Sequence, residues 1–353
     1  MRKDNITVGI VFGGKSREHD VSIESARAIC QHIDRDRYTP RLIYINKEGN
    51  WAFIEEEALM QAEAYRDTGL IKGIPEHFFS ISPWDSRSPV QAEIDIYFPI
   101  LHGPNGEDGK IQGLWELAGK PYVGANSFAS ALAMDKGVAK ALFQRAGLPT
   151  PGFLIFSGNN ETQIKQEVSQ HFHYPVFVKP CSLGSSVGIS KVKKEDELIP
   201  AVRIAFQYDK KIIIEQGLDA REIEISVMGN DEVLVSPPGE LIPANEFYDY
   251  ADKYLEGKTQ FIIPAHLSEE TESQIKGMAE AAYRTLSLNG MSRIDFFVEK
   301  GSQKVYINEI NTIPGFTEIS MFPRLFGLMG ISFTELVSRL IEYGFEYHEN
   351  FGD

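Results

Sequence analysis

The stretch VYINEINTIPGFTEIS, residues 305–320, decides how the rest of this chain is interpreted. Its apolar first part predicts a β-strand, in which residues two apart project from the same face. Glu309 and Asn311 would therefore present their oxygens side by side where the strand ends, just before Pro314 and Gly315 turn the chain. The pattern predicts a cation site at the end of a strand.

A second strand pattern at 292–299 carries Asp295, and antiparallel pairing would bring it beside Glu309 and Asn311. Two carboxylates about 4 Å apart repel by roughly 4 kcal/mol at an effective dielectric near 20, so the cluster calls for a cation. Oxygen ligands favour magnesium or manganese over zinc, and magnesium often serves a nucleotide phosphate. Arg293, on the face of Asp295, could stabilise an oxyanion. The alternative is an edge strand with solvated carboxylates.

The composition favours a cytoplasmic protein that acts on small molecules. A chain of 353 residues with 42% hydrophobic residues can bury more than one core. The 35 Lys and Arg residues against 50 Asp and Glu give a formal charge of −15, which disfavours nucleic acid and anionic membranes as partners. The apolar run near the N-terminus is too short to span a bilayer. Cys30 and Cys181 are too few for a disulfide scaffold.

Alternating strand and helix patterns predict an α/β fold, which we divide into domains at 1–124, 125–215 and 216–353. In the first domain, strand patterns at 6–14 and 94–101 each run into a glycine-rich turn. The ligand edge of the sheet would hold both turns.

The segment GIVFGGKS, residues 9–16, matches the phosphate-loop expression G-x-x-x-x-G-K-[ST] letter for letter. Residues 10–12 between its glycines look like the strand itself, so we reject a phosphate loop here. The turn that follows could instead receive a small substrate, with Glu18 accepting an ammonium and a helix N-terminus holding a carboxylate. The alternative is that Glu18 only favours the first helical turn electrostatically.

Further candidates for ligand binding each have a structural alternative. Residues 177–192 predict two strands joined by a Gly-Ser turn that could hold a phosphate beside Lys179, or an ordinary hairpin. Lys136, in a helix predicted over 127–148, would usually be solvated. His102 follows a strand's carboxyl end, where a catalytic role competes with a structural one.

Eight ordered runs together resemble the ATP-grasp ligases, and within them the D-alanine ligases. They are GGKSREHDVS, LHGPNGEDGKIQG, AMDKGVAK, VKPCSLGSSVGISKV, REIEISVMGN, FYDYADKY, RIDFF and NEINTIPGFTEISMFP. The first two and the last are specific to the D-alanine ligases. The resemblance implies a three-domain ATP-grasp fold with a Rossmann-like N-terminal domain and ATP gripped between the central and C-terminal domains.

The resemblance also implies which residues bind ATP and metal. Asp295, Glu309 and Asn311 would hold two Mg²⁺ or Mn²⁺ ions, and the Gly184 turn would cover the phosphates. The implied nucleotide-binding residues are Lys136, Lys179, Ser185, Ser186, Glu215, Leu218, Glu222, Lys253 and Phe297.

For the amino acids, the resemblance implies that Glu18 holds the ammonium of the first D-alanine and that Arg293 and the Gly315 amide stabilise a tetrahedral intermediate. Ser185 and Tyr254 would join Glu18 to close a lid formed by the polar loop at 244–260. The implied catalytic residues are Glu18, Ser185, Tyr254, Arg293 and Gly315; the implied substrate-binding residues are Glu18, His102, Arg293, Gly315, Ser320 and Met321.

The activity implied is ATP-dependent joining of two D-alanine molecules through a D-alanyl phosphate, for peptidoglycan precursor synthesis, by a cytoplasmic homodimer. Three alternatives stay open at this point. One is a D-alanine:D-lactate ligase of the same family, another a P-loop NTPase using residues 9–16, and the third a nucleotide-binding sensor without catalysis.

Overall fold

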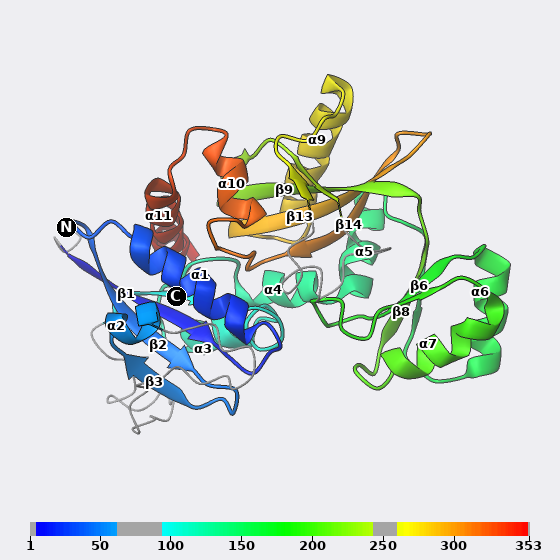
Figure 1. The fold of residues 1–353 in the computed structure, drawn as a ribbon, viewed down its shortest axis with the longest axis horizontal. Helices are drawn as coiled ribbons and strands as arrows, with labels where there is room; N and C mark the ends of the chain where they lie inside the picture. Colours follow the sequence, from blue (N-terminus) through cyan, green and yellow to red (C-terminus); the bar gives the residue numbers. More distant parts are fainter. Residues whose placement is uncertain (1–4, 62–93, 243–259, 352–353) are drawn as a thin grey trace.

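The computed structural model of the chain describes residues 5–61, 94–242 and 260–351. Within them the chain forms three β-sheets, which lie at the left, at the top centre and at the right of Figure 1. The described helices include none with the length and apolar character needed to cross a membrane.

The N-terminal sheet has the strand order β3-β2-β1-β4. β1 pairs in parallel with β2 and β4, so the turns after β1 and β4 meet at one edge, as predicted. Gly9 lies inside β1, which confirms that residues 9–16 are not a phosphate loop. The elements are β1 (Ile6–Gly13), α1 (His19–His32), β2 (Tyr38–Ile45), β3 (Trp51–Ile54), α2 (Glu56–Gln61), β4 (Ile96–Ile100) and α3 (Lys110–Leu117).

The second sheet, at the right of Figure 1, is antiparallel with the order β5-β8-β6-β7. The two strands predicted on either side of the Gly-Ser turn are β6 and β7, paired from Val176 opposite Val192. The elements are β5 (Phe153–Phe156), α6 (Glu161–His171), β6 (Val176–Pro180), β7 (Ser190–Val192), η1 (Glu195–Glu197), α7 (Leu198–Ala205) and β8 (Ile212–Gln216).

The C-terminal sheet is antiparallel with the order β12-β11-β9-β13-β14, and β10 also pairs with β9. The strands predicted around Glu222, Asp295 and Glu309 are β9, β13 and β14. The elements are β9 (Ala220–Gly229), β10 (Val233–Val235), β11 (Gly239–Ile242), β12 (Gln260–Ile262), α9 (Glu269–Thr285), β13 (Gly290–Glu299), β14 (Val305–Asn311), α10 (Met321–Gly327) and α11 (Phe333–Phe351).

The single helix predicted over 127–148 is wrong, because the chain forms two helices there. These are α4 (Ser127–Met134) and α5 (Lys136–Arg145), separated by Asp135 in an extended conformation. The Asp135 side chain caps α5 by accepting from the Val138 N–H, and the Lys136 N–H donates to the Cys181 carbonyl. The break therefore ties the start of α5 to the end of β6.

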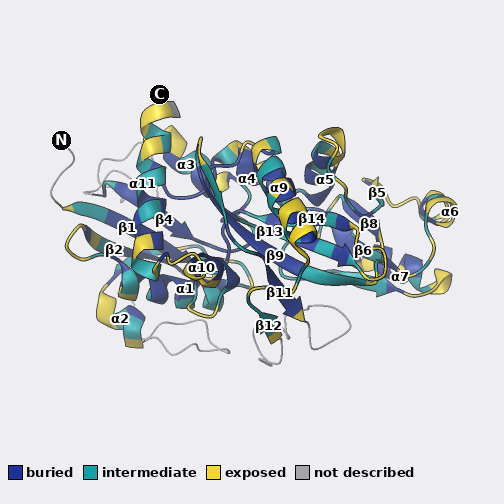
Figure 2. Cartoon of the chain, turned by 90° about the horizontal axis from the view of Figure 1, so that it is seen from above, coloured by how far each residue is buried: buried dark blue, intermediate teal, exposed yellow. Residues whose placement is uncertain are grey.

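The hydrophobic cores draw on helices that are distant in sequence. α4 and α5 pack under the C-terminal sheet with Ile223 and Ile294, whereas α11 packs into the core of the N-terminal sheet. In Figure 2 the strands of all three sheets are mostly buried. The boundaries at 124 and 215 stay a prediction.

Candidate active site

One face of the C-terminal sheet is apolar and the other carries charged side chains. Ile223 and Ile225 of β9, with Ile294 and Phe296 of β13, belong to the core between the sheet and its helices. Side chains alternate across a strand, so the intervening residues project from the opposite face. That second face carries Glu222, Glu224, Arg293, Asp295 and Phe297.

The strand register confirms the predicted meeting of Asp295 with Glu309. Asp295 lies opposite Glu224 on β9 and opposite Glu309 on β14, while Arg293 lies opposite Asn311. The register shifts directly after Asp295, because Phe296 pairs with Ile307 and leaves one extra residue on β14. The shift keeps Ile307 and Ile310 in the core on either side of Glu309.

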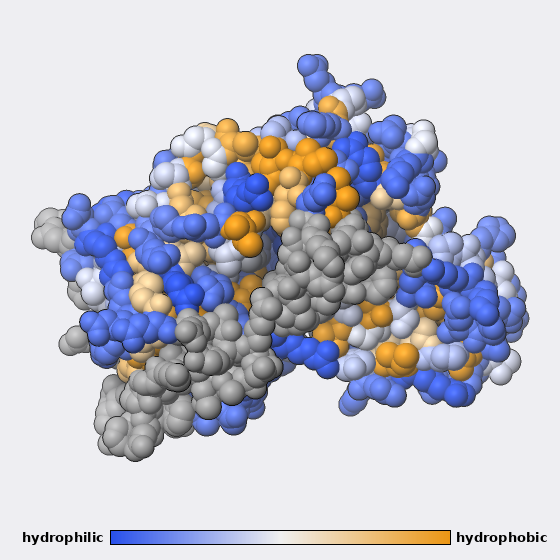
Figure 3. Space-filling model, viewed as in Figure 1, coloured by the Kyte–Doolittle hydropathy of each residue, from blue (hydrophilic) through white to orange (hydrophobic). Residues whose placement is uncertain are grey.

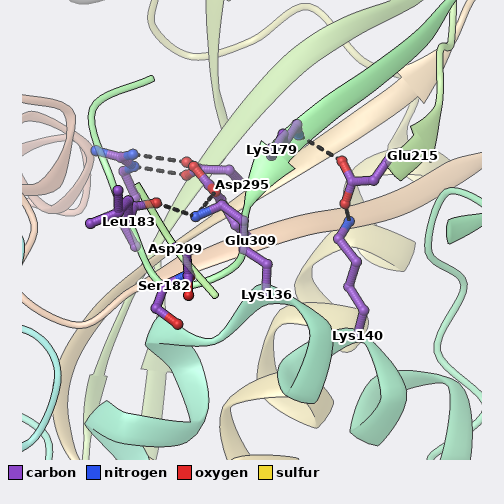
Figure 4. A network of polar contacts seen from close by, with 10 residues as sticks. Lys136, Lys140, Lys179, Ser182, Leu183, Asp209, Glu215, Asp295 and Glu309 are labelled. Atoms are coloured by element: carbon purple, nitrogen blue, oxygen red, sulfur yellow. Dashed lines mark hydrogen bonds and ion pairs between the residues drawn. The ribbon is translucent and has the colours of Figure 1, made fainter. Parts of the chain in front are cut away.

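Positive side chains neutralise these carboxylates in the structure. Arg293 donates from Nε and Nη2 to the two oxygens of Asp295, at 2.7 and 2.8 Å. Lys136 Nζ lies 3.3 Å from Glu309 Oε2 (Figure 4), and Asn311 Oδ1 accepts from the Ile313 N–H. Two carboxylates and an amide oxygen on neighbouring strands are a donor set that fits magnesium or manganese.

A second polar cluster surrounds Glu215 at the end of β8. Lys140 Nζ lies 2.8 Å from one Glu215 oxygen and Lys179 Nζ lies 2.6 Å from the other (Figure 4), and all three side chains are buried. Burial works to raise the pKa of Glu215, but the charges of Lys140 and then Lys179 outweigh it and lower the pKa to about 2. Burial lowers the pKa of Lys140, only partly offset by Glu215.

The Gly-Ser turn after β6 is held from both sides. Lys136 Nζ donates to the Leu183 carbonyl at 2.7 Å, and Asp209 accepts from the Ser182 N–H at 2.8 Å. Ser185 and Ser186 follow with φ of 51° and 58°, a left-handed conformation that costs energy for residues other than glycine. The Ser185 hydroxyl is buried and has no hydrogen-bond partner among the described residues. Lys136, predicted as a solvated side chain or a phosphate contact, is thus buried beside the turn.

The Glu18 side chain, from the N-terminal domain, lies close to the Gly-Ser turn. Glu18 is the residue before α1, and its carboxylate oxygen would lie 3.8 Å from a Cβ added to Gly184 and 3.1 Å from one added to Gly103. The Gly-Ser turn of one sheet and the glycine-rich turn of another therefore meet at one carboxylate. Such a carboxylate can accept a substrate ammonium.

His102 fixes the loop that carries Gly315. Its Nδ1 donates to the Ile313 carbonyl at 2.9 Å, so in the neutral ring Nε2 accepts from the Ser25 hydroxyl at 3.4 Å. The Ser25 oxygen in turn accepts from the Phe316 N–H. Burial lowers the pKa of His102, and the Glu18 carboxylate raises it in part. His102 therefore acts on the loop through the backbone groups on either side of Gly315.

A cavity of about 270 Å³ lies between the two glycine-rich turns of the N-terminal sheet. Its lining includes residues 13–16, His102 and residues 104–106. The predicted ligand edge of this sheet is thus hollow beside Ser16 and His102, with room for a small molecule.

Comparisons with known proteins agree with this geometry. The family described as D-ala D-ala ligase N-terminus matches residues 7–125, and the D-ala D-ala ligase C-terminus family matches residues 142–342. The D-alanine–D-alanine ligase of Thermoanaerobacter sp. (strain X514) is 44% identical over 348 residues, which cover 97% of each chain. The chain belongs to the D-alanine–D-alanine ligase family.

The fold of this chain is similar to the solved structures of two relatives. The D-alanine–D-alanine ligase from Coxiella burnetii has a TM-score of 0.86 at 34% identity, covering 99% of this chain and 96% of that one. The VanG D-Ala:D-Ser ligase from Enterococcus faecalis has a TM-score of 0.85 at 34% identity, covering 96% and 99%. The predicted ATP-grasp fold is confirmed.

The structure of this ligase brings most of the predicted site residues to one region. Leu218 lies in the link between β8 and β9, and Phe297 lies opposite Glu222 in the sheet register. Ser320 is the residue before α10, and its hydroxyl lies 3.0 Å from a Cβ added to Gly315. Met321 is buried, with its side chain against Gly239. Lys253 and Tyr254 lie outside the described residues.

Lys140, Glu224 and Glu107 are buried charged residues that were not predicted from the sequence. Lys140 lies one helical turn after Lys136, and Glu224 lies two residues after Glu222 on the same strand face, so periodicity could have found both. Glu107 lies in the glycine-rich turn and accepts from the Gly103 N–H at 2.5 Å. Burial, followed by the charge of Glu18, raises the pKa of Glu107 to about 8.

The surface near α10 is more apolar than the end formed by α6 and α7, as Figure 3 shows. Ile319, just before α10, is 74% exposed, and Leu328 and Met329 follow the helix on the surface. Polar side chains cover the outer end of the second sheet, at the right of Figure 3.

Proposed function

We propose that this chain joins two D-alanine molecules to D-alanyl-D-alanine with the conversion of ATP to ADP and phosphate. The observation that carries the proposal is the meeting of Glu18 with the Gly184 turn beside the paired strands of Asp295 and Glu309. An amino-acid site and a phosphate site then share one region. The membership in the D-alanine–D-alanine ligase family supports the same substrates.

In the first step a D-alanine carboxylate oxygen attacks the γ-phosphorus of ATP, and ADP leaves. Phosphoryl transfer is catalysed mainly by positioning and by neutralising charge. Lys136 and Lys179 would supply positive charge at the phosphates, and Glu18 would hold the substrate ammonium. Asp295, Glu309 and Asn311 would hold Mg²⁺ or Mn²⁺, which neutralises phosphate charge.

In the second step the amine of another D-alanine, after losing a proton, attacks the acyl carbon, and inorganic phosphate leaves. Arg293 and the Gly315 amide would stabilise the oxyanion of the tetrahedral intermediate. His102 and Ser25 would keep that amide in place through Ile313 and Phe316. Ser320 would contact the second amino acid, and Ser185 would join Glu18 over the first.

The test is phosphate release with ATP and magnesium across a panel of D- and L-amino acids and D-lactate. We expect release with D-alanine and none with L-alanine. Identifying the products with D-alanine and D-lactate present together separates the dipeptide ligase from the D-alanine:D-lactate alternative. ADP formation without any amino acid would contradict the proposal.

We further propose that the ligase works in the cytoplasm, where ATP is available, and as a homodimer. Sedimentation of the purified chain at micromolar concentration tests the second point. A species with the mass of one 39.6 kDa chain would contradict it.

A further inference from the structure

The carboxylates of Asp295 and Glu224 both lie beside the Arg293 guanidinium. Asp295 accepts hydrogen bonds from Arg293 Nε and Nη2 at 2.7 and 2.8 Å, and Glu224 Oε2 lies 3.4 Å from the same Nε. Glu224 is only 6% exposed, so its charge is buried and close to a positive group. Buried carboxylates are retained where a partner compensates the cost of desolvation.

The two partners are not equivalent if Asp295 also holds a cation. A carboxylate oxygen that coordinates a divalent ion becomes a weaker acceptor for hydrogen bonds from a guanidinium. Arg293 would then lose much of its hold on Asp295. Glu224, on the neighbouring strand β9, would still lie beside the guanidinium, with its Oε2 3.4 Å from Arg293 Nε.

Glu224 could instead be a third cation ligand, since the register sets Glu224, Asp295 and Glu309 in one row across three strands. The distances argue against this. In the described part of the chain no three His, Cys, Asp or Glu side chains converge closely enough to hold a metal ion. Glu224 Oε2 instead lies 3.4 Å from the Nε of the Arg293 guanidinium.

We infer that Glu224 is a positioning residue that holds the Arg293 guanidinium toward the reacting carbonyl while Asp295 serves the cation. The inference rests on the proposed function, because it assigns Arg293 to the oxyanion. Charge and geometry both matter here. A planar guanidinium must keep its orientation to meet a developing oxyanion, and a fixed carboxylate behind it provides that orientation.

Glu240 provides a matched control in the same sheet. It is 7% exposed and pairs with Arg221 at 2.8 and 2.6 Å, so it is also a buried carboxylate on an arginine. Glu240 lies directly opposite Ile223 in the strand register, so it shares the face of the sheet on which Ile223 joins the core. This face is the one that points away from Arg293 and Asp295. Glu240→Gln therefore reports the effect of removing such a pair away from the site.

The experiment compares Glu224→Gln, Glu240→Gln and Arg293→Lys with the parent ligase, together with the Glu224→Gln, Arg293→Lys double variant. We expect Glu224→Gln to lower kcat roughly ten- to hundredfold with the KM for ATP within about twofold, while Glu240→Gln keeps its kcat. In the Arg293→Lys background, Glu224→Gln should add less than about a twofold loss, because its effect passes through Arg293. Glu224→Asp, which keeps the charge, should recover part of the rate.

A measurement without turnover separates positioning from metal binding. The Kd of Mn²⁺ in the presence of ADP, measured by electron paramagnetic resonance, should be unchanged by Glu224→Gln and raised by Glu309→Gln. A raised Kd in Glu224→Gln would make Glu224 a ligand and overturn the inference. A multiplicative loss in the double variant, or an unchanged kcat in Glu224→Gln, would also overturn it. A parent chain without D-alanine-dependent turnover would instead contradict the proposed function itself.

Discussion

The Arg293 guanidinium and the Asp295 carboxylate, two residues apart on β13, form a two-point hydrogen bond at 2.7 and 2.8 Å. On the neighbouring strand β14, Asn311 lies opposite Arg293 and Glu309 lies opposite Asp295. A proposed cation ligand and a proposed oxyanion group are thus joined directly. Changes at either residue should act on the same step.

Replacing a proposed cation ligand should remove activity and leave the fold. We expect Asp295→Ala and Glu309→Ala each to lower turnover by roughly a thousandfold or more, because the charge that balances the phosphates is lost. The measurement is phosphate release at saturating ATP and magnesium, with circular dichroism as the control for folding. A variant of either kind that keeps half its activity would refute the assignment.

Arg293→Lys should be nearly inactive although it keeps the charge. A lysine ammonium is a point charge and cannot reproduce a planar fork that binds a carboxylate on one side while it faces a carbonyl on the other. We expect kcat to fall roughly a hundredfold with little change in the KM for ATP. Near-normal turnover would move the oxyanion role to another group. Lys300→Arg, at an exposed ion pair with Asp219, is the control and should behave as the parent.

The charged face of β13 could be predicted from the sequence because buried and partly exposed residues alternate along this strand from Ser292 onward. Buried Ile294 and Phe296 alternate with Arg293 and Asp295, so the face of each charged residue followed from periodicity alone. The pairing of Asp295 with Glu309 followed because only a short turn separates their strands. The predicted cation ligands thus depended on local pattern.

What the sequence could not show depends on contacts between distant segments. The helix break at Asp135 depends on a distant contact, because it arises where the Lys136 N–H donates to the Cys181 carbonyl. The pairing of Lys140 with Glu215 joins α5 to β8 and leaves no local trace. Lys136 was likewise predicted to be solvated as a lone helix residue, although the structure buries it beside Leu183 and Glu309.

Lys140→Met should destabilise the ligase, and most at pH values where Glu215 is ionised in the folded chain. Glu215, whose pKa is lowered to about 2, adds stability above its unfolded pKa near 4.5, and that stability is lost as the pH falls toward 2. Without Lys140 one of the two cations beside Glu215 is gone, so we expect a loss of roughly 3 kcal/mol near pH 7 that becomes smaller as the pH falls toward the range where Glu215 is protonated.

Urea unfolding of the parent and Lys140→Met between pH 4 and pH 7 measures both effects. The control is Lys194→Met, which breaks an exposed ion pair with Asp196 and should leave the unfolding curve unchanged. If Lys140→Met were as stable as the parent throughout, the buried cluster would contribute nothing to folding.

Glu107→Gln should change how stability depends on pH. The pKa of Glu107 is raised to about 8 by burial and then by the Glu18 charge, while the Gly103 N–H, Arg293 and Lys136 oppose the rise. The folded chain keeps a proton that the unfolded chain releases above about pH 4.5, so the contribution of Glu107 to stability declines as the pH rises toward 8.

Glutamine keeps an acceptor for the Gly103 N–H but cannot ionise. We therefore expect the melting temperature of Glu107→Gln to gain on that of the parent as the pH is raised from 5 to 8. Glu57→Gln, at an exposed residue of α2, should follow the parent at every pH. If the difference between Glu107→Gln and the parent stayed constant across this range, Glu107 would be ionised in the folded chain. The second oxygen of Glu107, buried without a hydrogen-bond partner among the described residues, would then carry charge that no hydrogen bond at that atom compensates.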